Sequence, residues 1–308
     1  MKSAQQSPFV CIVVLNHNGQ RWLPDCLQTL LATAYDNLKV ILVDNASTDG
    51  GLNYVRTHHP AVEIIENAAN LGFAAGNNIG IERALALGAD YVVLLNPDTK
   101  VQPAWLAELI EVGEREPALG ILGAVQLAYE SEAYNNWTEK VAAARLANLS
   151  AEERARKWLA LEWVEGSCFA IKRAVLQRVG ALDPLYDSFY EEIDFCRRAD
   201  CAGFQTGLAV SSFIHHHRGG IWTENSRRQR ERDYLCDRGQ FIYSLTDPRR
   251  SLLGNLRSWL VTVAVKGRDA VREMELPRLA ALLRIQAFLL ASGSVVYQKW
   301  KRDQLLLR

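Results

Sequence analysis

The sequence lacks several patterns that define common protein classes. Six of its 308 residues are cysteine, no two of them form a CxxC pair, and most stand among apolar residues. Such thiols are typical of a reduced core rather than of a disulfide framework. No uninterrupted apolar run reaches the roughly 18 residues needed to span a bilayer, and no basic, apolar leader opens the chain. These absences predict a cytoplasmic protein without a membrane-spanning helix.

Two nucleotide-binding motifs are also missing. The turn after the first predicted strand reads Asn16-His17-Asn18-Gly19, where a dinucleotide-binding protein carries GxGxxG. No GxxxxGK[ST] segment is present either, so a dehydrogenase and a phosphate-loop NTPase are both disfavoured. Basic and acidic residues are balanced at 35 each, and we expect no nucleic-acid partner.

The overall neutrality hides an asymmetry between the two parts of the chain. Residues 227–308 hold 17 Lys and Arg against 8 Asp and Glu, a net charge of +9, whereas residues 1–226 hold 18 against 27, a net of −9. The apolar stretches of this tail, 252–265 and 279–296, are interrupted or followed by basic residues: Arg257, Lys266, Arg284 and Lys299. This pattern fits amphipathic helices on an anionic membrane. It fits equally a helical appendage that packs on the main domain with its basic face in water.

Strand and helix patterns alternate along the first half of the chain. Strands are predicted at 9–16, 39–44, 62–66, 91–95, 119–127, 163–172 and 206–214, and helices at 21–33, 51–58, 73–87, 103–114 and 190–202. This rhythm predicts an α/β fold, a mostly parallel sheet flanked by helices, with a C-terminal helical appendage. We divide the chain into a domain of residues 1–226, with a helical insertion at about 130–160, and a basic helical region of residues 227–308.

Two acidic residues follow predicted buried strands. Asp98 comes just beyond the strand 91–95, after an Asn-Pro turn that cannot continue a strand. Asp44 closes the second strand. Open α/β sheets bind ligands at the carboxyl ends of their strands, so these carboxylates can reach a divalent cation or a nucleotide. A purely local role for Asp44, in an Asx turn and helix cap, fits the same pattern.

Several ordered segments carry a family resemblance. The first are Asn16-His17-Asn18-Gly19, Val43-Asp44-Asn45-Ala46-Ser47-Thr48-Asp49-Gly50, Asn70-Leu71-Gly72-Phe73-Ala74-Ala75-Gly76-Asn77-Asn78-Ile79-Gly80 and Leu95-Asn96-Pro97-Asp98. Glu165-Gly166-Ser167-Cys168, Gly180-Ala181-Leu182-Asp183 and Phe189-Tyr190-Glu191-Glu192-Ile193-Asp194 follow. Together they resemble the inverting family-2 glycosyltransferases of GT-A fold, especially the rhamnosyltransferase-like branch. The resemblance covers residues 9 to about 220, apart from the insertion.

The resemblance implies a nucleoside-diphosphate sugar donor, most often dTDP- or UDP-linked, and Mn²⁺ or Mg²⁺. It assigns donor contacts to Asn16, Asn18, Asp44, Asn45, Asn70, Asn78, Asn96 and Asp98. Asp98 is also the implied metal ligand, because it matches the last acid of the DxD-like motif. The consecutive histidines His215, His216 and His217 follow a strand, and His215 matches the metal-site histidine best. His217 is the second candidate, because alternate strand side chains share a face.

The same resemblance implies one catalytic base. Glu192 matches the second acid of the family's ED pair, with Glu in place of Asp. Asp194 is the alternative base, and Glu191 is expected to orient the acceptor. Acidic residues in a first helical turn also favour the helix dipole without any catalytic role.

The implied reaction transfers a sugar, rhamnose or another hexose, to a glycan or lipid-linked acceptor at the inner face of the membrane. Two alternatives remain. A sugar nucleotidylyltransferase uses a similar sheet and Mg²⁺, but its glycine-rich basic loop is absent. An inactive nucleotide-sugar-binding scaffold is disfavoured by the intact acids. Three tryptophans are available to stack on acceptor sugars or to fill the core: Trp137, Trp163 and Trp222.

Overall fold

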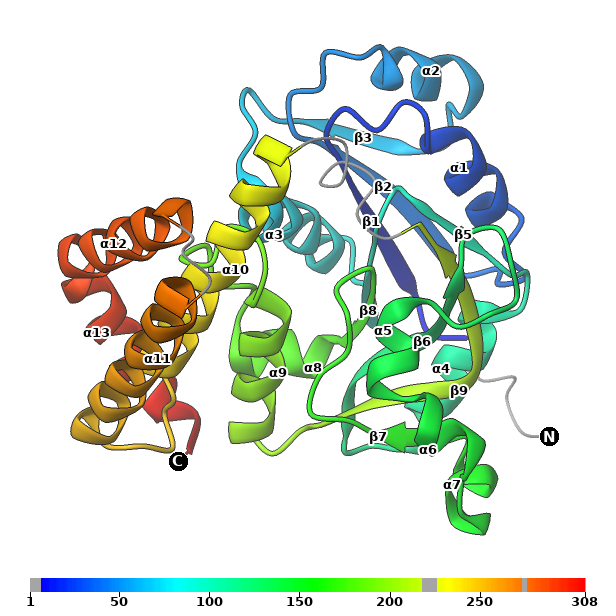
Figure 1. Cartoon of the computed structure of the whole chain (residues 1–308). Helices are drawn as coiled ribbons and strands as arrows, with labels where there is room; N and C mark the ends of the chain where they lie inside the picture. The colour runs from blue at the N-terminus through cyan, green and yellow to red at the C-terminus, as the bar shows by residue number, and fades with distance from the viewer. Residues whose placement is uncertain (1–6, 218–225, 273–275, 308) are drawn as a thin grey trace.

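The computed structural model describes residues 7–217, 226–272 and 276–307. Within these residues one nine-stranded sheet has the order β3-β2-β1-β4-β8-β6-β9-β5, with β7 paired to β9 (Figure 1). The strands are β1 Val10–Asn16, β2 Leu38–Asp44, β3 Glu63–Glu66, β4 Tyr91–Leu95, β5 Thr99–Val101, β6 Leu119–Ala128, β7 Trp158–Ala160, β8 Cys168–Lys172 and β9 Gln205–His216.

The sheet is mixed but mostly parallel, as predicted. Strands β3, β2, β1 and β4 are parallel neighbours, and β6 and β9 form a second parallel pair. β8 joins the two groups by pairing antiparallel with both β4 and β6. The short strands β5 and β7, which the sequence pattern did not predict, pair antiparallel with β9.

Alternating side chains of the central strands fill two hydrophobic layers. Val10, Ile12 and Val14 of β1 face the helices α1 (Leu23–Leu31), α2 (Gly51–His58) and α4 (Trp105–Arg115). Cys11 and Val13 face α3 (Gly72–Ala86), α8 (Arg173–Val179) and α9 (Glu191–Cys201) on the opposite side. Period-two alternation with both faces apolar produces this sandwich. All six cysteines are free, and four are buried.

The predicted insertion contains three short helices, α5 (Asn136–Val141), α6 (Ala143–Ala147) and α7 (Ala151–Arg156). Asn135 caps α5, because its side chain accepts hydrogen bonds from the backbone of Trp137 and Thr138. Trp137 is buried and meets Trp163 edge to face, with ring centroids 5.8 Å apart. The insertion therefore packs on the sheet domain through a tryptophan.

Strand β9 carries a bulge halfway along its pairing with β6. The four-residue step from Ala209 to Phe213 on β9 lies opposite the single step from Ala124 to Val125 on β6. Ser212, inside the bulge, donates a hydrogen bond to the carbonyl oxygen of Trp105, 2.8 Å away. Because the number of extra residues is odd, the bulge exchanges which side chains of the remaining strand lie on each face of the sheet.

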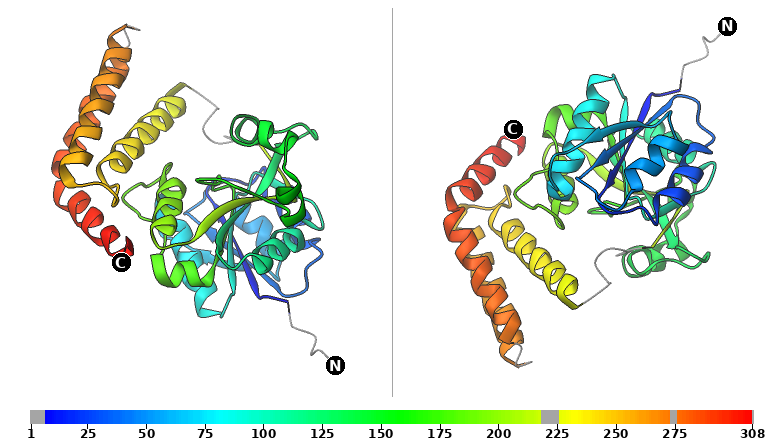
Figure 2. Two further views of the ribbon diagram at one scale, coloured as in Figure 1. Left: turned by 90° about the horizontal axis from the view of Figure 1, so that it is seen from below. Right: turned by 90° about the horizontal axis from the view of Figure 1, so that it is seen from above.

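Four helices complete the chain: α10 (Ser226–Leu245), α11 (Leu252–Arg272), α12 (Leu276–Ala291) and α13 (Gly293–Asp303), followed by a short 3₁₀ turn, Gln304–Leu307. They gather on one side of the sheet domain in every view (Figures 1 and 2). They share a small hydrophobic core that includes Phe241, Ile285 and, from the sheet domain, Tyr186. The predicted C-terminal helical appendage is thus confirmed.

Membrane-spanning potential in these helices is limited. No single helix among the described residues is both long and apolar enough to cross a bilayer. Pro277–Ala291 and Gly293–Leu307 reach that length and composition only together, and the chain bends by 70° between them.

Candidate active site

The polar ends of three parallel strands meet at one edge of the sheet. Asn16 at the end of β1 pairs in register with Asp44 at the end of β2, and Val14 pairs with Leu95 at the end of β4. Asp98 follows β4 by three residues. This is the edge at which open α/β sheets bind ligands.

Asp44 is nearly completely buried and held by local hydrogen bonds. Its Oδ1 accepts from Nδ2 of Asn16 at 2.8 Å and from the Ser47 hydroxyl at 2.7 Å, and its Oδ2 accepts from the Ser47 backbone N–H at 2.9 Å. The local turn considered for this residue is therefore present. A carboxylate offers about four acceptor positions, so Oδ2 keeps capacity for a further donor. Oδ1 of Asn16 is buried without a hydrogen-bond partner in the described chain.

Three other asparagines brace the loops around this edge. Asn18 has a left-handed backbone (φ 51°), and its Oδ1 accepts from the Thr48 backbone at 2.8 Å. Nδ2 of Asn45 donates to Asn70 at 3.2 Å and to the carbonyl oxygen of Gly72 at 3.0 Å. These contacts tie the first, second and third strand-end loops to one another, and so they shape the site without being aimed into it.

Asn78 joins two elements of the sheet domain. Its amide nitrogen donates to the carbonyl oxygen of Leu182 at 2.8 Å, and its amide oxygen accepts from the backbone N–H of the same residue at 3.0 Å. Both ends of the side chain are engaged in joining α3 to the loop after α8. A contact of Asn78 with the donor stays a prediction. Asn96 is held through its backbone, which donates to Ser167 at 3.0 Å.

Asp98 faces a histidine because β5 pairs with the end of β9. Thr99 lies opposite His216 in the ladder, and Oδ1 of Asp98 is 3.4 Å from Nε2 of His216. The other ring nitrogen of His216 is 3.1 Å from Oε1 of Gln126 and 3.6 Å from a carboxylate oxygen of Glu165. The sequence reasoning missed Gln126 and Glu165 as parts of the site, although Glu165 opens one of the family motifs.

The charges of this pair stabilise each other. Burial alone would lower the pKa of His216, but the negative charge of Asp98 and hydrogen bonds to Asp98 and Glu165 outweigh it and raise the pKa to about 9. Burial likewise favours a higher pKa for Asp98, and the charge of His216 reverses this, so the pKa of Asp98 is lowered. Without a bound ion, the two groups form an ion pair.

The side chains of His215 and His217 contact other groups than the carboxylate of Asp98. Nδ1 of His215 is 2.9 Å from the carbonyl oxygen of Ala128, and its Nε2 is 3.7 Å from Glu132. The ring of His217 packs on Trp22, with centroids 4.2 Å apart, while its backbone N–H donates to the carbonyl oxygen of Asp98 at 3.0 Å. The preference for His215 is therefore corrected to His216. His217 stays close to Asp98, but through its backbone.

Asp98 and His216 together suit a divalent cation. Adjacent ligands of an octahedral ion with bonds of about 2.1 Å lie about 3 Å apart, close to the 3.4 Å between these two atoms. A carboxylate with an imidazole is a donor set that suits Mn²⁺. In the part of the chain that the structure describes, no group of three or more His, Cys, Asp or Glu side chains is arranged to hold a metal.

Glu191 and Glu192 begin helix α9 beside the segment that carries Glu165. Burial, reinforced by the negative charge of Glu165, raises the pKa of Glu192 to about 7 although backbone hydrogen bonds oppose the shift. Gly166 lies next to Glu192 and the ring of Phe73: a methyl group added to it would lie 3.3 Å from the ring and 3.9 Å from Cβ of Glu192. Burial and the neighbouring Glu192 raise the pKa of the buried Glu191 well above its usual range.

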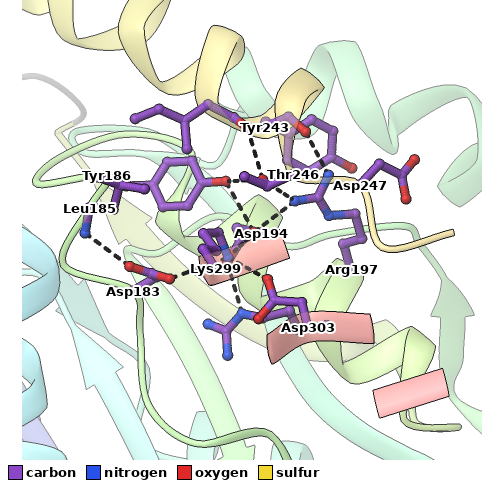
Figure 3. Close-up of polar contacts among 12 residues, drawn as sticks. Asp183, Leu185, Tyr186, Asp194, Arg197, Tyr243, Thr246, Asp247, Lys299 and Asp303 are labelled. Carbon is purple, nitrogen blue, oxygen red and sulfur yellow. Dashed lines mark hydrogen bonds and ion pairs between the residues drawn. The ribbon is translucent and has the colours of Figure 1, made fainter. Parts of the chain in front are cut away.

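Asp194 is unsuited to accept a proton from a substrate. It is fully buried, and its carboxylate lies 2.9 Å from Arg197 and 3.0 Å from Lys299 (Figure 3). Arg198 lies 2.8 Å from the same carboxylate. Burial alone would raise the pKa of Asp194, but these three positive charges lower it far below the usual range. The structure thus corrects the view of Asp194 as an alternative base and makes it a structural charge.

A groove of about 650 Å³ runs along the side of α9. Ile193 and Arg197 of α9 line it, and Trp163 and, from α10, Tyr243 contribute aromatic rings to the lining. Trp163 lies two residues before Glu165, so the same segment lines the groove and reaches His216. Of the other tryptophans considered, Trp137 is buried, and Trp222 lies outside the described residues.

Comparisons with known proteins agree with this geometry. The model of a family described as glycosyl transferase family 2 matches residues 11–180. The chain belongs to this family. It is therefore a glycosyltransferase, and the predicted resemblance is confirmed.

Two relatives are about one quarter identical to this chain in sequence. An N-acetylglucosaminyl-diphospho-decaprenol L-rhamnosyltransferase of Mycobacterium tuberculosis is 25% identical over 239 residues, which cover 67% of this chain and 75% of that protein. A low-salt glycan biosynthesis hexosyltransferase of Haloferax volcanii is 24% identical over 211 residues, 67% of this chain and 66% of its own.

Solved structures share the fold. The mannosyltransferase PcManGT of Pyrobaculum calidifontis, in complex with GDP-Man and Mn²⁺, aligns with a TM-score of 0.61 and 19% identity over 98% of this chain and 86% of its own. The S. aureus protein TarS, in complex with UDP-GlcNAc, aligns with a TM-score of 0.59 and 12% identity over 97% of this chain and 90% of its own. These neighbours confirm the GT-A fold.

Replacing Asp194 with Asn should lower the free energy of unfolding by about 3–5 kcal/mol, because Arg197, Arg198 and Lys299 each lose a buried carboxylate partner. The pKa of Asp194 is depressed in the folded state, so its stabilising effect is complete at neutral pH and fades as the pH falls below about 4. Urea unfolding between pH 7 and pH 3 measures both effects.

The matched control is Asp200→Asn on the same helix. The Asp200 side chain is 66% exposed and pairs with Arg249 at 3.3 Å, so its loss should change the stability by less than about 1 kcal/mol. Equal stability losses in the two variants would contradict the structural role of Asp194.

Proposed function

We propose that the protein transfers a sugar from a nucleoside-diphosphate donor to a glycan or lipid-linked acceptor with inversion, by a single displacement. One observation carries the proposal: His216 lies between Asp98 and Glu165, and the charge of Glu165 acts on the half-buried carboxylate Glu192. A site for a leaving diphosphate and a base for an acceptor hydroxyl are thus linked through Glu165.

The donor's nucleoside is proposed to bind at Asp44 and Asn16. The remaining acceptor capacity on Asp44 and the buried, unpartnered oxygen of Asn16 suit the N–H groups and hydroxyls of a pyrimidine nucleoside. Relatives named for a rhamnosyltransferase and a hexosyltransferase, and neighbours solved with GDP-Man and UDP-GlcNAc, support this donor class. We favour a dTDP- or UDP-linked sugar.

We propose Mn²⁺ or Mg²⁺ as the cofactor, held by Asp98 and His216. When bound, the ion would neutralise the charge that develops on the leaving diphosphate. His216 must lose its proton to bind the ion. The structural neighbours solved with Mn²⁺ include PcManGT and GalNAc-T7.

Glu192 is the proposed base. The acceptor oxygen forms a bond to the anomeric carbon while the bond from that carbon to the diphosphate oxygen breaks, and Glu192 takes the hydroxyl proton. A carboxyl group with a pKa of about 7 is partly ionised at neutral pH and is matched to this proton transfer. Glu191, buried behind it, is proposed to orient the acceptor side of the site.

The groove beside α9 is the proposed path of the acceptor. Its aromatic walls, Trp163 and Tyr243, suit the apolar faces of sugar rings, and its arginines, Arg145 and Arg249, can hydrogen-bond ring hydroxyls or an anionic group. A volume of about 650 Å³ accommodates a ligand larger than one sugar.

The C-terminal helices are proposed to rest on an anionic membrane surface. Leu253 and Leu260 of α11 lie seven residues apart and are 78% and 57% exposed, and Leu283 and Leu290 of α12 show the same spacing at 72% and 82%. The basic residues Arg257 and Arg284 are exposed beside them. Exposed apolar stripes with adjacent basic side chains are typical of helices that bind membranes in plane.

The alternatives have less support. A sugar nucleotidylyltransferase is disfavoured by family membership and by the absence of a glycine-rich basic first loop. An inactive scaffold would not require the paired Asp98 and His216 beside a base with a raised pKa.

Metal-dependent binding of the nucleoside diphosphate should rest on Asp98. Titration calorimetry with dTDP, UDP and GDP should find one that binds more tightly with Mn²⁺, and Asp98→Ala should remove that gain. Asp36→Ala is the control, because Asp36 is exposed just before the opposite end of β2. Equal affinity of the wild type with Mn²⁺ and with EDTA would exclude a metal-assisted donor site.

Replacing Glu192 with Gln should reduce turnover by roughly 10²–10⁴ while donor affinity holds, because the amide cannot take the proton. Release of nucleoside diphosphate from the donor measures turnover. In the wild type the rate should rise with pH through about 7 as the carboxylate forms, and the variant should lose that rise. Unchanged turnover in Glu192→Gln would assign the base elsewhere.

Sedimentation with vesicles tests the membrane surface. The full chain should pellet with phosphatidylglycerol vesicles at low salt, less at high salt, and not with neutral vesicles, because each basic residue near the surface adds about 1 kcal/mol. Serine in place of Leu253, Leu260, Leu283 and Leu290 should abolish pelleting, whereas Leu31→Ser on the sheet domain should not. A wild-type chain that stays in the supernatant at low salt contradicts the proposal.

A further inference from the structure

A cluster of buried charges joins the last helix to the helix of the proposed base. Lys299 of α13 is 3% exposed, and its Nζ lies 3.0 Å from Asp194, 2.6 Å from Asp303 and 3.3 Å from Asp183 (Figure 3). Lys299 and Asp194 are 105 residues apart in sequence. One ammonium group thus bridges α13, α9 and the loop that precedes α9.

The carboxylates of the cluster are each paired with cations. Asp194 also pairs with Arg197 and Arg198 of its own helix, and Asp183 pairs with Arg302 at 2.7 Å. Arg197 also donates to the carbonyl oxygen of Tyr243 at 2.7 Å, and so it ties α9 to α10. Arg198 donates to the carbonyl oxygens of Val179 and Ala181 before the loop. Lys299 contacts all three carboxylates, and it is the cation that joins α9 and Asp183 to α13.

The loop between Asp183 and Glu191 is held in a costly conformation. Asp187, Phe189 and Tyr190 have left-handed backbones, with φ of 66°, 69° and 74°. Such conformations in residues other than glycine persist only where the surroundings impose them. The last of these residues comes directly before Glu191 and Glu192, so the direction in which α9 starts depends on this loop.

The C-terminal helices impose that conformation from two sides. From α10, Arg238 donates to the carbonyl oxygen of Tyr186 at 2.9 Å, and Gly239 lies against Phe189 and Tyr190, where an added methyl would come within 2.9 Å of both. From α13, Lys299 and Arg302 hold Asp183 at the start of the loop.

The loop between Asp183 and Glu191 also contacts the start of α3, next to the proposed donor site. The carbonyl oxygen of Asp187 accepts from the backbone N–H groups of Phe73 at 2.9 Å and Ala74 at 3.1 Å, at the start of α3. Gly72, at the same point, leaves no room for a side chain: an added methyl would lie 2.1 Å from a carboxylate oxygen of Asp187. A single loop therefore contacts the α3 end of the donor site, the proposed base and the C-terminal helices.

We propose that Lys299 is a positioning residue for Glu192. By holding Asp194 and Asp183 together, it keeps the loop in its left-handed conformation and fixes the first turn of α9, so that the base meets the acceptor hydroxyl. This inference rests on the proposed role of Glu192. The side chain of Lys299 itself touches no reacting group.

The decisive variant is Lys299→Met, which keeps most of the aliphatic stem and removes the charge, with Lys301→Met as its control. Lys301 stands two residues away on α13 and is exposed. Both are compared in the full chain with the donor that the wild type turns over. In Lys299→Met, kcat should fall about 10²-fold, because a small misplacement of a catalytic group has that effect. Donor KM should stay within about twofold of the wild type, because Asp44 and Asp98 are unaffected.

Hydrogen exchange supplies a readout that does not depend on activity. Peptides covering 183–192 should exchange faster in Lys299→Met, while peptides from β1 and β2 and all peptides of Lys301→Met should match the wild type. If Lys299→Met fails to fold, Arg302→Met is used instead: the Arg302 side chain is 58% exposed and holds the same loop through Asp183. It should show the same changes at smaller size.

Three outcomes overturn the proposal. They are an unchanged kcat in a folded Lys299→Met chain, a loss of donor binding equal to the loss of kcat, and unchanged exchange over 183–192. If the wild type releases diphosphate from no donor, the proposed function fails instead, and the exchange comparison still decides whether Lys299 orders the loop.

Discussion

The pairing of β5 with the end of β9 is the constraint on which the site depends. It returns the chain from the Asn96-Pro97-Asp98 turn to the sheet and sets Thr99 opposite His216. Because of this register, a carboxylate from one sheet edge and an imidazole from a strand more than 110 residues later face each other at 3.4 Å. Without it, Asp98 would be one more polar residue on a strand-end turn. The loops after β1, β2 and β3, in contrast, are braced by hydrogen bonds within residues 16–72.

The local part of the fold could be predicted from the sequence, and the long-range part could not. Strands β1, β2 and β4 and the acids at their ends follow from apolar runs and turn residues, which are local signals. The choice among His215, His216 and His217 depends on a bulge that inverts the alternation of β9, and no pattern in the sequence marks it. Likewise, the acids of α9 differ in role because Lys299 reaches only Asp194.

Ion pairs with the sheet domain explain part of the positive charge of residues 227–308. The excess of positive charge in the tail was interpreted as a membrane signal or as a solvated face. In part it is neither, because Lys299, Arg302 and Arg249 pair with Asp194, Asp183 and Asp200 of the sheet domain. Acidic residues of one part of the chain thus find their counter-charges in the other. The basic residues that remain for an anionic surface include Arg257 of α11 and Arg284 of α12, beside the exposed leucines.

The buried lysine also affects how this enzyme can diverge. Many chains exchange appended helices freely, because the join is a solvated linker and the interface carries little charge. Here a foreign C-terminal region without a lysine at the position of Lys299 would leave Asp183 and Asp194 of the sheet domain buried near each other with one cation fewer between them. We therefore expect the segment 183–198 and the helices α10–α13 to be inherited together. Recombination that separates them should be selected against, even though the family match ends at residue 180, before either part.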